Sequence, residues 1–252
     1  MHHDESQSIS GLSFEHLSLV YPDGTKAIQD LSLTVAPEEF VSVVGPSGCG
    51  KSSLLRVAAA LESPSVGLCR VDPSGIGYVF QDATLLPWRN VRRNVQLFGE
   101  LHGFSPARLH DASASAIDLV GLAGSEEKFP HQLSGGMRMR ASLARSLVLD
   151  PVLFLFDEPF GALDEITRER LNDEVLRLFI ERGFAALFVT HSIAEAVYMS
   201  SRVVVMSERP GTVLGEVVVP FSYPRSHELR YETEFGRVCA EVSALLGGGT
   251  RG

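Results

Sequence analysis

The sequence is poor in lysine and carries an excess of negative charge. Only Lys26, Lys51 and Lys128 are lysines among its 22 basic residues, which face 31 acidic residues, and the formal net charge is −9. Binding to the phosphate backbone of DNA or RNA depends on clustered lysine and arginine. We therefore expect no nucleic-acid partner, and the one lysine inside a glycine-rich segment, Lys51, stands out.

Cysteine and long apolar runs are also scarce. Cys49, Cys69 and Cys239 form an odd set with no CxxC pair and no histidine at metal-ligand spacing, which favours neither a disulfide framework nor a zinc site. No stretch approaches the roughly 18 consecutive apolar residues that span a bilayer. The first residues lack the basic and apolar regions of a signal peptide. These absences favour a protein of the reducing cytoplasm.

What the chain does contain is a series of short, apolar strand patterns. At 252 residues and 44% hydrophobic composition, its length suits one hydrophobic core with one inserted lobe. A helical pattern separates each later strand run from the next, which predicts an α/β protein with a mostly parallel sheet covered by helices. The runs that read as strands are 31–35, 40–44, 152–156, 185–190 and 203–206.

Strand patterns vanish between about residues 84 and 145, where short helical patterns punctuated by glycine and proline take over. This change predicts a helical lobe inserted into the sheet domain. A last amphipathic helix is predicted through Phe235, Val238, Val242 and Leu245, and the glycines from 247 onward are expected to end it. We expect one domain over 11–246, with flexible tails at 1–10 and 247–252.

A glycine-rich segment follows the strand run 40–44 directly. It reads GPSGCGKS and fits the phosphate-loop pattern GxxxxGK[ST] before a helical run. Glycine N–H groups and the helix N-terminus face phosphates in such loops, while Lys51 reaches the β- and γ-phosphates and Ser52 offers its hydroxyl to Mg²⁺. The residues predicted to bind the nucleotide here are Gly45, Pro46, Ser47, Gly48, Cys49, Gly50, Lys51, Ser52 and Ser53.

The strand run 152–156 ends in two acids, Asp157 and Glu158. The carboxyl end of a parallel strand lies at the sheet edge that holds the phosphate loop. Asp157 is predicted to hold Mg²⁺ directly or through its water, and Glu158 to polarise the attacking water as the general base. A solvated turn is the alternative interpretation, and the phosphate loop upstream favours the chemical one.

The segment Leu133-Ser-Gly-Gly-Met137 resembles the ABC signature, and the chain resembles an ABC transporter nucleotide-binding domain from end to end. The resemblance implies a P-loop NTPase with a RecA-like core, an N-terminal antiparallel β subdomain and an inserted α-helical subdomain. It also implies a head-to-tail dimer, homodimer or pseudo-dimer, in which Ser134, Gly135 and Gly136 face the γ-phosphate of an ATP held by the partner. Met137 stands where the commonest version of the motif has glutamine.

Four further positions resemble functional residues of the family. Tyr21 resembles the aromatic residue that stacks on adenine, although a tyrosine before a turn is a packing residue about as often. Gln81 resembles the glutamine that approaches Mg²⁺ and the attacking water. Asp164 resembles the aspartate of the loop at the dimer seam, and His191 resembles the switch histidine that contacts the γ-phosphate.

His191 has an additional local argument. Ser192 and Glu195 follow it with the spacing of a capping box, in which serine and glutamate side chains satisfy the first N–H groups of a helix. A helix is therefore predicted to begin directly after His191. This would leave the imidazole at the carboxyl edge of the sheet, beside the phosphates.

Cys49 lies inside the phosphate loop. The simpler interpretation is a small residue at a variable position. The alternative hypothesis is that the nearby helix N-terminus and Lys51 lower the pKa of its thiol, so that alkylation would block ATP binding.

The surroundings of the motifs favour an importer subunit. Lys51 and Ser134 are only 83 positions apart, which leaves no room for the long coiled coils of DNA-repair relatives, and a single such domain differs from translation-factor relatives. The segments 84–91 and 221–225 resemble the branch that serves nitrate, sulfonate, taurine and related solutes. The resemblance implies an Mg-dependent ATPase at the cytoplasmic face of the inner membrane, bound to an integral permease and indirectly to a solute-binding protein. An ATPase of an ABC efflux system, or a non-transport ABC ATPase, is the alternative.

An apolar cluster follows Gln81 in the sequence. Leu85, Leu86 and Trp88 lie at the start of the predicted helical lobe, where such residues form either lobe core or a docking site. We hypothesise that residues 81–93 form a groove for a short cytoplasmic helix of the permease.

Overall fold

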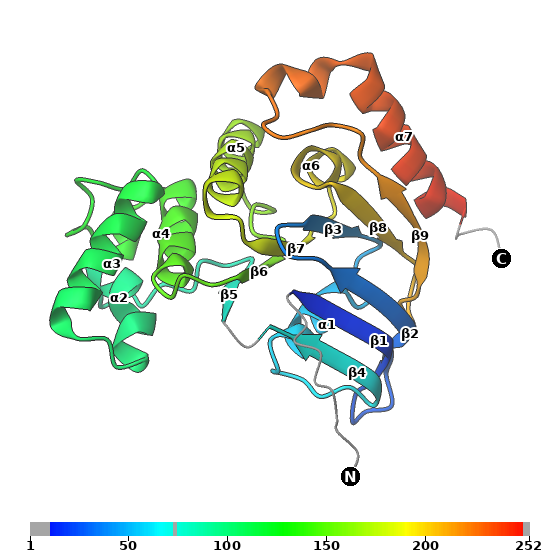
Figure 1. Ribbon diagram of the computed structural model, residues 1–252, viewed down its shortest axis with the longest axis horizontal. Coiled ribbons are helices and arrows are strands. Elements are labelled where there is room, and N and C mark those ends of the chain that lie inside the picture. The colour runs from blue at the N-terminus through cyan, green and yellow to red at the C-terminus, as the bar shows by residue number, and fades with distance from the viewer. Residues whose placement is uncertain (1–10, 73–74, 249–252) are drawn as a thin grey trace, which may run out of the picture.

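The computed structural model describes residues 11–72 and 75–248. The chain forms a six-stranded sheet, a three-stranded antiparallel sheet beside it and a group of helices at one side of the six-stranded sheet (Figure 1). The helical group consists of α2, α3 and α4, which pack against one another. The described part of the chain therefore has the α/β organisation that the strand and helix patterns predict.

The six-stranded sheet carries the elements that build the site. Its strand order is β5-β6-β7-β3-β8-β9, and every neighbouring pair is parallel except β8 with β9. Because β5, β6, β7 and β3 are adjacent and run the same way, their carboxyl ends share one sheet edge. The strands are β3 Phe40–Val44, β5 Ile76–Val79, β6 Leu153–Asp157, β7 Ala185–Val189, β8 Arg202–Met206 and β9 Val213–Val218.

The second sheet has the order β2-β1-β4, with both pairs antiparallel. Its strands are β1 Leu12–Val20, β2 Lys26–Val35 and β4 Val66–Val71. One face of the six-stranded sheet packs with this sheet and helix α1, since Val41 and Val43 share a cluster with Leu54 and Leu55. The antiparallel sheet thereby lies beside the phosphate loop.

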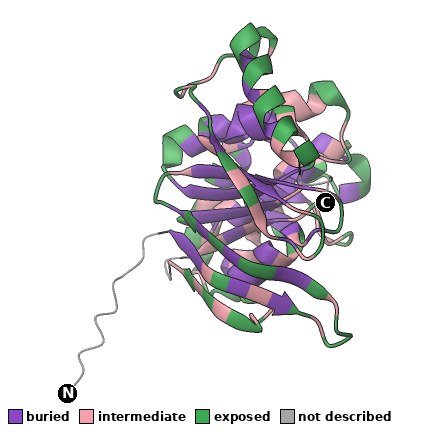
Figure 2. Cartoon of the chain, turned by 90° about the vertical axis from the view of Figure 1, so that its right-hand side faces the viewer, coloured by how far each residue is buried: buried purple, intermediate pink, exposed green. Residues whose placement is uncertain are grey.

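Helices from later in the chain cover the opposite face. Phe40 and Val44 of β3 share a second cluster with residues of α4, α5, α6 and α7. Phe40 contacts the rings of Phe156, Phe179 and Phe188 at centroid distances of 6.2, 5.3 and 5.8 Å. Buried residues accordingly concentrate in the central strands (Figure 2). The helices are α1 Lys51–Ala58, α2 Val91–Leu101, α3 Pro106–Leu119, α4 Gly135–Leu147, α5 Glu165–Arg182, α6 Ile193–Met199 and α7 Thr233–Gly248, with 3₁₀ turns η1 Pro130–Gln132 and η2 His227–Tyr231.

The predicted fold class is confirmed, and one boundary differs. Helix α7 buries Phe235, Val238 and Val242 as expected but runs to Gly248. The expectation of a tail from residue 247 is therefore wrong for Gly247 and Gly248, because the cost of about 1 kcal/mol for a helical glycine does not stop a helix that is packed through other residues. The predicted tails at 1–10 and 249–252 lie outside the described residues. The extent of the domain as a whole stays a prediction.

No helix among the described residues is both long enough and apolar enough to cross a membrane.

Candidate functional site

The phosphate loop joins the buried strand β3 to helix α1. Gly48 and Gly50 adopt left-handed φ angles of +76° and +110°, and Gly50 is the N-cap of α1. A side chain at Gly50 would put its Cβ 2.6 Å from the Ala27 carbonyl oxygen. Only glycine fits this backbone and this approach. The loop thus follows the predicted segment and directs the N-terminus of α1 to its concave side.

Lys51 is held within this loop. Its side chain is only 5% exposed, and Nζ donates to the carbonyl oxygens of Gly45 and Pro46 at 2.9 and 3.0 Å. A buried ammonium group is stable only with such partners. The cation is therefore fixed at the centre of the loop, where a phosphate group would lie.

Ser52 and Asp157 come together across 105 positions of sequence. Ser52 Oγ donates to Asp157 Oδ1 at 2.7 Å, and Tyr78 Oη donates to Asp157 Oδ2 at 3.3 Å. Burial raises the pKa of Asp157, and the hydrogen bonds from Ser52 and Tyr78 partly offset this effect. A hydroxyl and a carboxylate are hard oxygen donors that suit Mg²⁺, and Gln81 lines the same cavity as Ser52.

A second pair lies at the ends of β6 and β7. His191 Nδ1 is 2.8 Å from Glu158 Oε2. A methyl group on Gly161 would lie 3.5 Å from His191 Cε1 and 3.8 Å from Gln81 Nε2. Gln81, Glu158 and His191 therefore converge on the turn after β6, and this gathers the predicted base, switch and metal-approaching residues.

The capping box after His191 is only half formed. Ser192 Oγ accepts from the Glu195 N–H at 3.3 Å, as predicted. The Ser192 N–H donates to Thr190 Oγ1 at 3.1 Å, and the Thr190 hydroxyl donates to the Glu195 carboxylate. The predicted reciprocal contact is wrong because the Thr190 hydroxyl lies between the two groups. Helix α6 still begins directly after Ser192.

Tyr21 is the first residue after β1. Its hydroxyl oxygen is 2.9 Å from Ser53 Oγ. This contact ties the end of the antiparallel sheet to the first turn of α1. The ring borders the same cavity as the phosphate loop, which is where an adenine-stacking residue would have to be.

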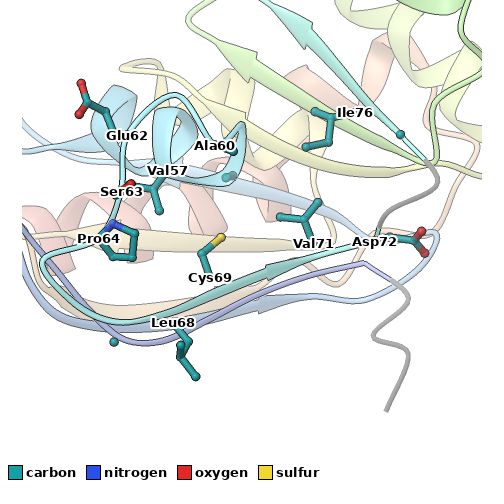
Figure 3. A pocket seen from close by; sticks show the side chains of 13 residues that line it. Val57, Ala60, Glu62, Ser63, Pro64, Leu68, Cys69, Val71, Asp72 and Ile76 are labelled. Carbon is teal, nitrogen blue, oxygen red and sulfur yellow. The ribbon is translucent and has the colours of Figure 1, made fainter. Parts of the chain in front are cut away.

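A cavity of about 330 Å³ brings most of these residues together. It is lined by Tyr21, Ala27, Ser47, Gly48, Gly50, Lys51, Ser52, Ser53, Gln81, Glu158 and Arg209. A larger cavity of about 600 Å³ lies between α1 and β4, where Val57, Cys69 and Val71 gather around it (Figure 3). It contains none of the predicted site residues, so the smaller cavity is the candidate nucleotide site.

Ser134, Gly135, Gly136 and Asp164 do not line this cavity. Ser134 caps α4 by accepting from the Met137 N–H at 3.2 Å, and Asp164 caps α5 by accepting from the Thr167 N–H at 3.0 Å. These two helix starts lie against each other. A methyl group on Gly135 would lie 3.0 Å from Leu163 Cδ2, and one on Gly136 would lie 2.8 Å from Thr167 Cγ2.

Cys49 does not have the environment of a reactive thiol. Its side chain is 1% exposed, and burial raises the pKa of the thiol, an effect that the Lys51 charge only partly offsets. The hypothesis of a lowered pKa is therefore wrong, because desolvation outweighs the attraction of the nearby cation. The Cys49 side chain packs into the core beneath the loop, and a contribution of this residue to nucleotide binding stays a prediction.

Besides Ala27, two residues with polar side chains at the site had no sequence prediction. Tyr78, in β5, donates to the Asp157 carboxylate, and Arg209, in the turn between β8 and β9, borders the cavity. Tyr78 lies three residues before Gln81, in the strand that leads to it. No recognised motif contains Arg209, and its approach depends on tertiary structure alone.

A buried parallel strand, a glycine loop and a helix N-terminus that enclose a lysine define a P-loop NTPase fold. Residues 28–161 match the family profile described as ABC transporter. The chain belongs to the ABC transporter family.

Relatives and solved structures agree with this assignment. The chain is 42% identical over 221 residues to the taurine import ATP-binding protein TauB of Yersinia pestis, covering 85% of this chain and 84% of the relative. It is 37% identical over 235 residues to the nitrate import ATP-binding protein NrtD of Synechocystis, covering 88% of each. The dimeric structure of MJ0796, a bacterial ABC transporter cassette, matches 84% of this chain and 100% of that chain with a TM-score of 0.74 and 27% identity. The predicted family resemblance is confirmed.

Proposed function

We propose that this chain is the ATP-binding and ATP-hydrolysing subunit of an ABC importer that powers uptake of a small solute through a separate permease. The observation that best supports ATP hydrolysis is a pair of side-chain contacts at the site, between Ser52 and Asp157 and between Glu158 and His191. The names of the taurine and nitrate relatives support import of a small solute of that kind.

Each residue of the site has a distinct task in this proposal. Lys51 and the N–H groups of the loop neutralise the β- and γ-phosphates. Ser52, Gln81 and Asp157 would hold Mg²⁺, which supplies further charge neutralisation when bound. Glu158 accepts the proton of the attacking water. His191, whose Nδ1 is 2.8 Å from Glu158 Oε2, would contact the γ-phosphate.

The working unit in this proposal is a head-to-tail dimer. Ser134, Gly135 and Gly136 border no part of their own nucleotide cavity, yet Ser134 presents a helix N-terminus suited to an anion. A partner's nucleotide is the anion that would use it. Asp164, exposed at the start of the neighbouring helix, would lie at the same seam. The dimeric solved cassette supports the formation of a dimer.

A permease is the proposed membrane partner. Trp88 is 71% exposed, and Leu85 and Leu86 beside it are half-buried. An exposed tryptophan next to further apolar side chains is typical of a protein-docking surface. We assign residues 81–93 to the permease contact, which would hold the subunit peripherally at the cytoplasmic face of the membrane. A solute-binding protein would act on the permease from the other side.

The test is transport by the reconstituted complex. The purified chain and its permease are placed in vesicles, with the solute-binding protein outside and Mg-ATP inside, and uptake of labelled taurine, a sulfonate and nitrate is measured. We expect ATP-dependent uptake of one of these, with ATPase activity lost in Lys51→Ala. The import assignment would be overturned if ATP hydrolysis moved solute outward, or if it moved none of the tested solutes in either direction.

A further inference from the structure

The turn between β8 and β9 is fastened to the phosphate loop. The Gly211 N–H donates to the Ala27 carbonyl at 3.0 Å, and the Gln29 N–H donates to the Gly211 carbonyl at 3.0 Å. A side chain at Gly211 would put its Cβ 2.2 Å from the Cys49 carbonyl oxygen. Only glycine permits this approach. The turn therefore occupies a fixed position against the loop that binds phosphate.

The same turn is closed by its own hydrogen bonds. Ser207 Oγ accepts from the Thr212 N–H at 2.9 Å and donates to the Glu208 carbonyl at 2.9 Å. Residues between these anchors have little freedom to move. Arg209 is consequently presented to the cavity by a braced segment.

Arg209 extends from this turn to the rim of the nucleotide cavity. Its Nε donates to the Gly48 carbonyl at 2.9 Å. Its two terminal NH₂ groups have no hydrogen-bond partner among residues 11–72 and 75–248, and the residue is exposed. A guanidinium group offers five N–H donors in a planar fork that matches phosphate oxygens. Four of these donors remain for a ligand.

The positive charge of Arg209 suits this cavity to an anionic ligand. Lys51 and Arg209 are the cationic side chains among the lining residues of the cavity, and Glu158 is anionic. Nucleoside diphosphates and triphosphates bring several negative charges to this place, in a chain whose own net charge is −9. A second cation would offset the repulsion from the nearby carboxylates.

The surroundings of Arg209 indicate which part of a nucleotide it would meet. The turn that carries Arg209 is bonded through Gly211 to Ala27 and Gln29 of β2, and the Tyr21 N–H donates to the Thr25 carbonyl at 2.9 Å in the hairpin that joins β1 to β2. Arg209 therefore lies on the Tyr21 side of Gly48. If the base stacks on Tyr21, this side corresponds to the ribose and the first phosphate, away from Glu158 and His191.

From this geometry we propose that Arg209 is a further nucleotide-binding residue, whose guanidinium group bonds to the phosphate nearest the ribose of ATP and ADP alike. The inference rests on the proposed nucleotide site and adds a residue that no motif of the chain contains.

The test compares Arg209→Ala and Arg209→Lys with the wild-type chain. Dissociation constants for Mg-ATP and Mg-ADP are measured by calorimetry at fixed ionic strength, and melting temperatures are measured without nucleotide. We expect Arg209→Ala to weaken ATP and ADP by the same factor, about tenfold, because one charge-assisted contact is lost. Arg209→Lys should retain more of the affinity than Arg209→Ala, since the charge remains although the planar fork is lost. Arg237→Ala, an exposed arginine on α7, is the matched control and should change neither constant.

Three results would overturn the proposal. Affinities of Arg209→Ala within twofold of wild type would show no contact. A loss as large in Arg209→Lys as in Arg209→Ala, together with a lower melting temperature, would show that Arg209 only braces Gly48. A loss confined to ATP would assign it to the γ-phosphate side. In contrast, a wild-type chain that binds neither nucleotide would contradict the proposed function itself.

Discussion

His191 Nδ1 lies 2.8 Å from Glu158 Oε2, so the residues that follow two neighbouring parallel strands form a direct contact. Glu158 holds a left-handed φ of +45°, and its N–H donates to the Val189 carbonyl at 2.9 Å. A non-glycine residue in this region is strained and needs such support. The contact fixes the imidazole and the carboxylate relative to each other.

Glu158→Gln should separate ATP binding from hydrolysis. The amide keeps the shape of the side chain and a contact with His191 but cannot accept the proton of water. We expect hydrolysis to fall by about 100-fold or more, the usual contribution of a general base, with ATP affinity within a few-fold of wild type. A dimer should accumulate with Mg-ATP, visible by size-exclusion chromatography. Hydrolysis close to the wild-type rate would refute the role of Glu158, and Glu165→Gln, at an exposed carboxylate, is the control.

Mixed dimers should reveal the head-to-tail arrangement. In the proposed dimer a Lys51→Ala subunit paired with a Ser134→Arg subunit retains one intact site, because loop and serine turn come from different chains. A doubly substituted subunit paired with wild type retains none. In a Glu158→Gln background, we expect the first pair to retain one ATP and the second pair to retain none, as measured by nucleotide released from purified heterodimers. Equal retention by the two pairs would contradict the arrangement.

Coupling to the permease should depend on the exposed apolar residues after Gln81. Trp88→Glu with Leu86→Glu should abolish solute uptake in the reconstituted complex while ATP hydrolysis by the isolated subunit stays within about twofold, because these side chains lie outside the nucleotide cavity. Val218→Glu, at an apolar residue on β9 that is 74% exposed, is the matched control and should leave uptake unchanged. Intact uptake in the double variant would remove residues 81–93 from the permease contact.

The buried Glu195 should make stability depend on pH. Its side chain is only 7% exposed, and burial raises its pKa, partly offset by the hydrogen bond from Thr190. The folded chain therefore keeps this proton to higher pH than the unfolded chain. The unfolding free energy of the wild type, relative to that of Glu195→Gln, should therefore fall as the pH rises above the ordinary pKa of a glutamate, about 4.3. The limiting slope is about 1.4 kcal/mol per pH unit.

Urea denaturation of the wild type and Glu195→Gln between acid and neutral pH measures this difference. A difference in unfolding free energy that stays constant with pH would exclude a raised pKa in the folded state. Glu232→Gln, at an exposed carboxylate, should show no comparable trend.

The sequence predicted the parts of this molecule that follow from local pattern. The apolar run 40–44 is a buried parallel strand, the run 185–190 contains one at 185–189, and GPSGCGKS is the loop at the end of β3. Contacts between distant segments were harder to predict. The expected contact between the Ser192 N–H and the Glu195 carboxylate is replaced, because the Thr190 hydroxyl bonds to both of these groups. The pKa of Cys49 rises because burial, which the loop sequence does not reveal, outweighs a neighbouring charge. Arg209 reaches Gly48 across 161 positions, a distance over which no motif operates.

Gly135 and Gly136 lie close to Leu163 and Thr167 of their own chain. A methyl group on Gly136 would lie only 2.8 Å from Thr167 Cγ2, so it would not fit there. In the proposed dimer, the serine turn that they shape completes a site on the opposite chain. In that dimer, the geometry of each ATP site depends on packing inside one chain, while the phosphate loop of the other chain holds the nucleotide. A packing defect at Gly136 would leave its own subunit able to bind ATP and would disable its neighbour's site.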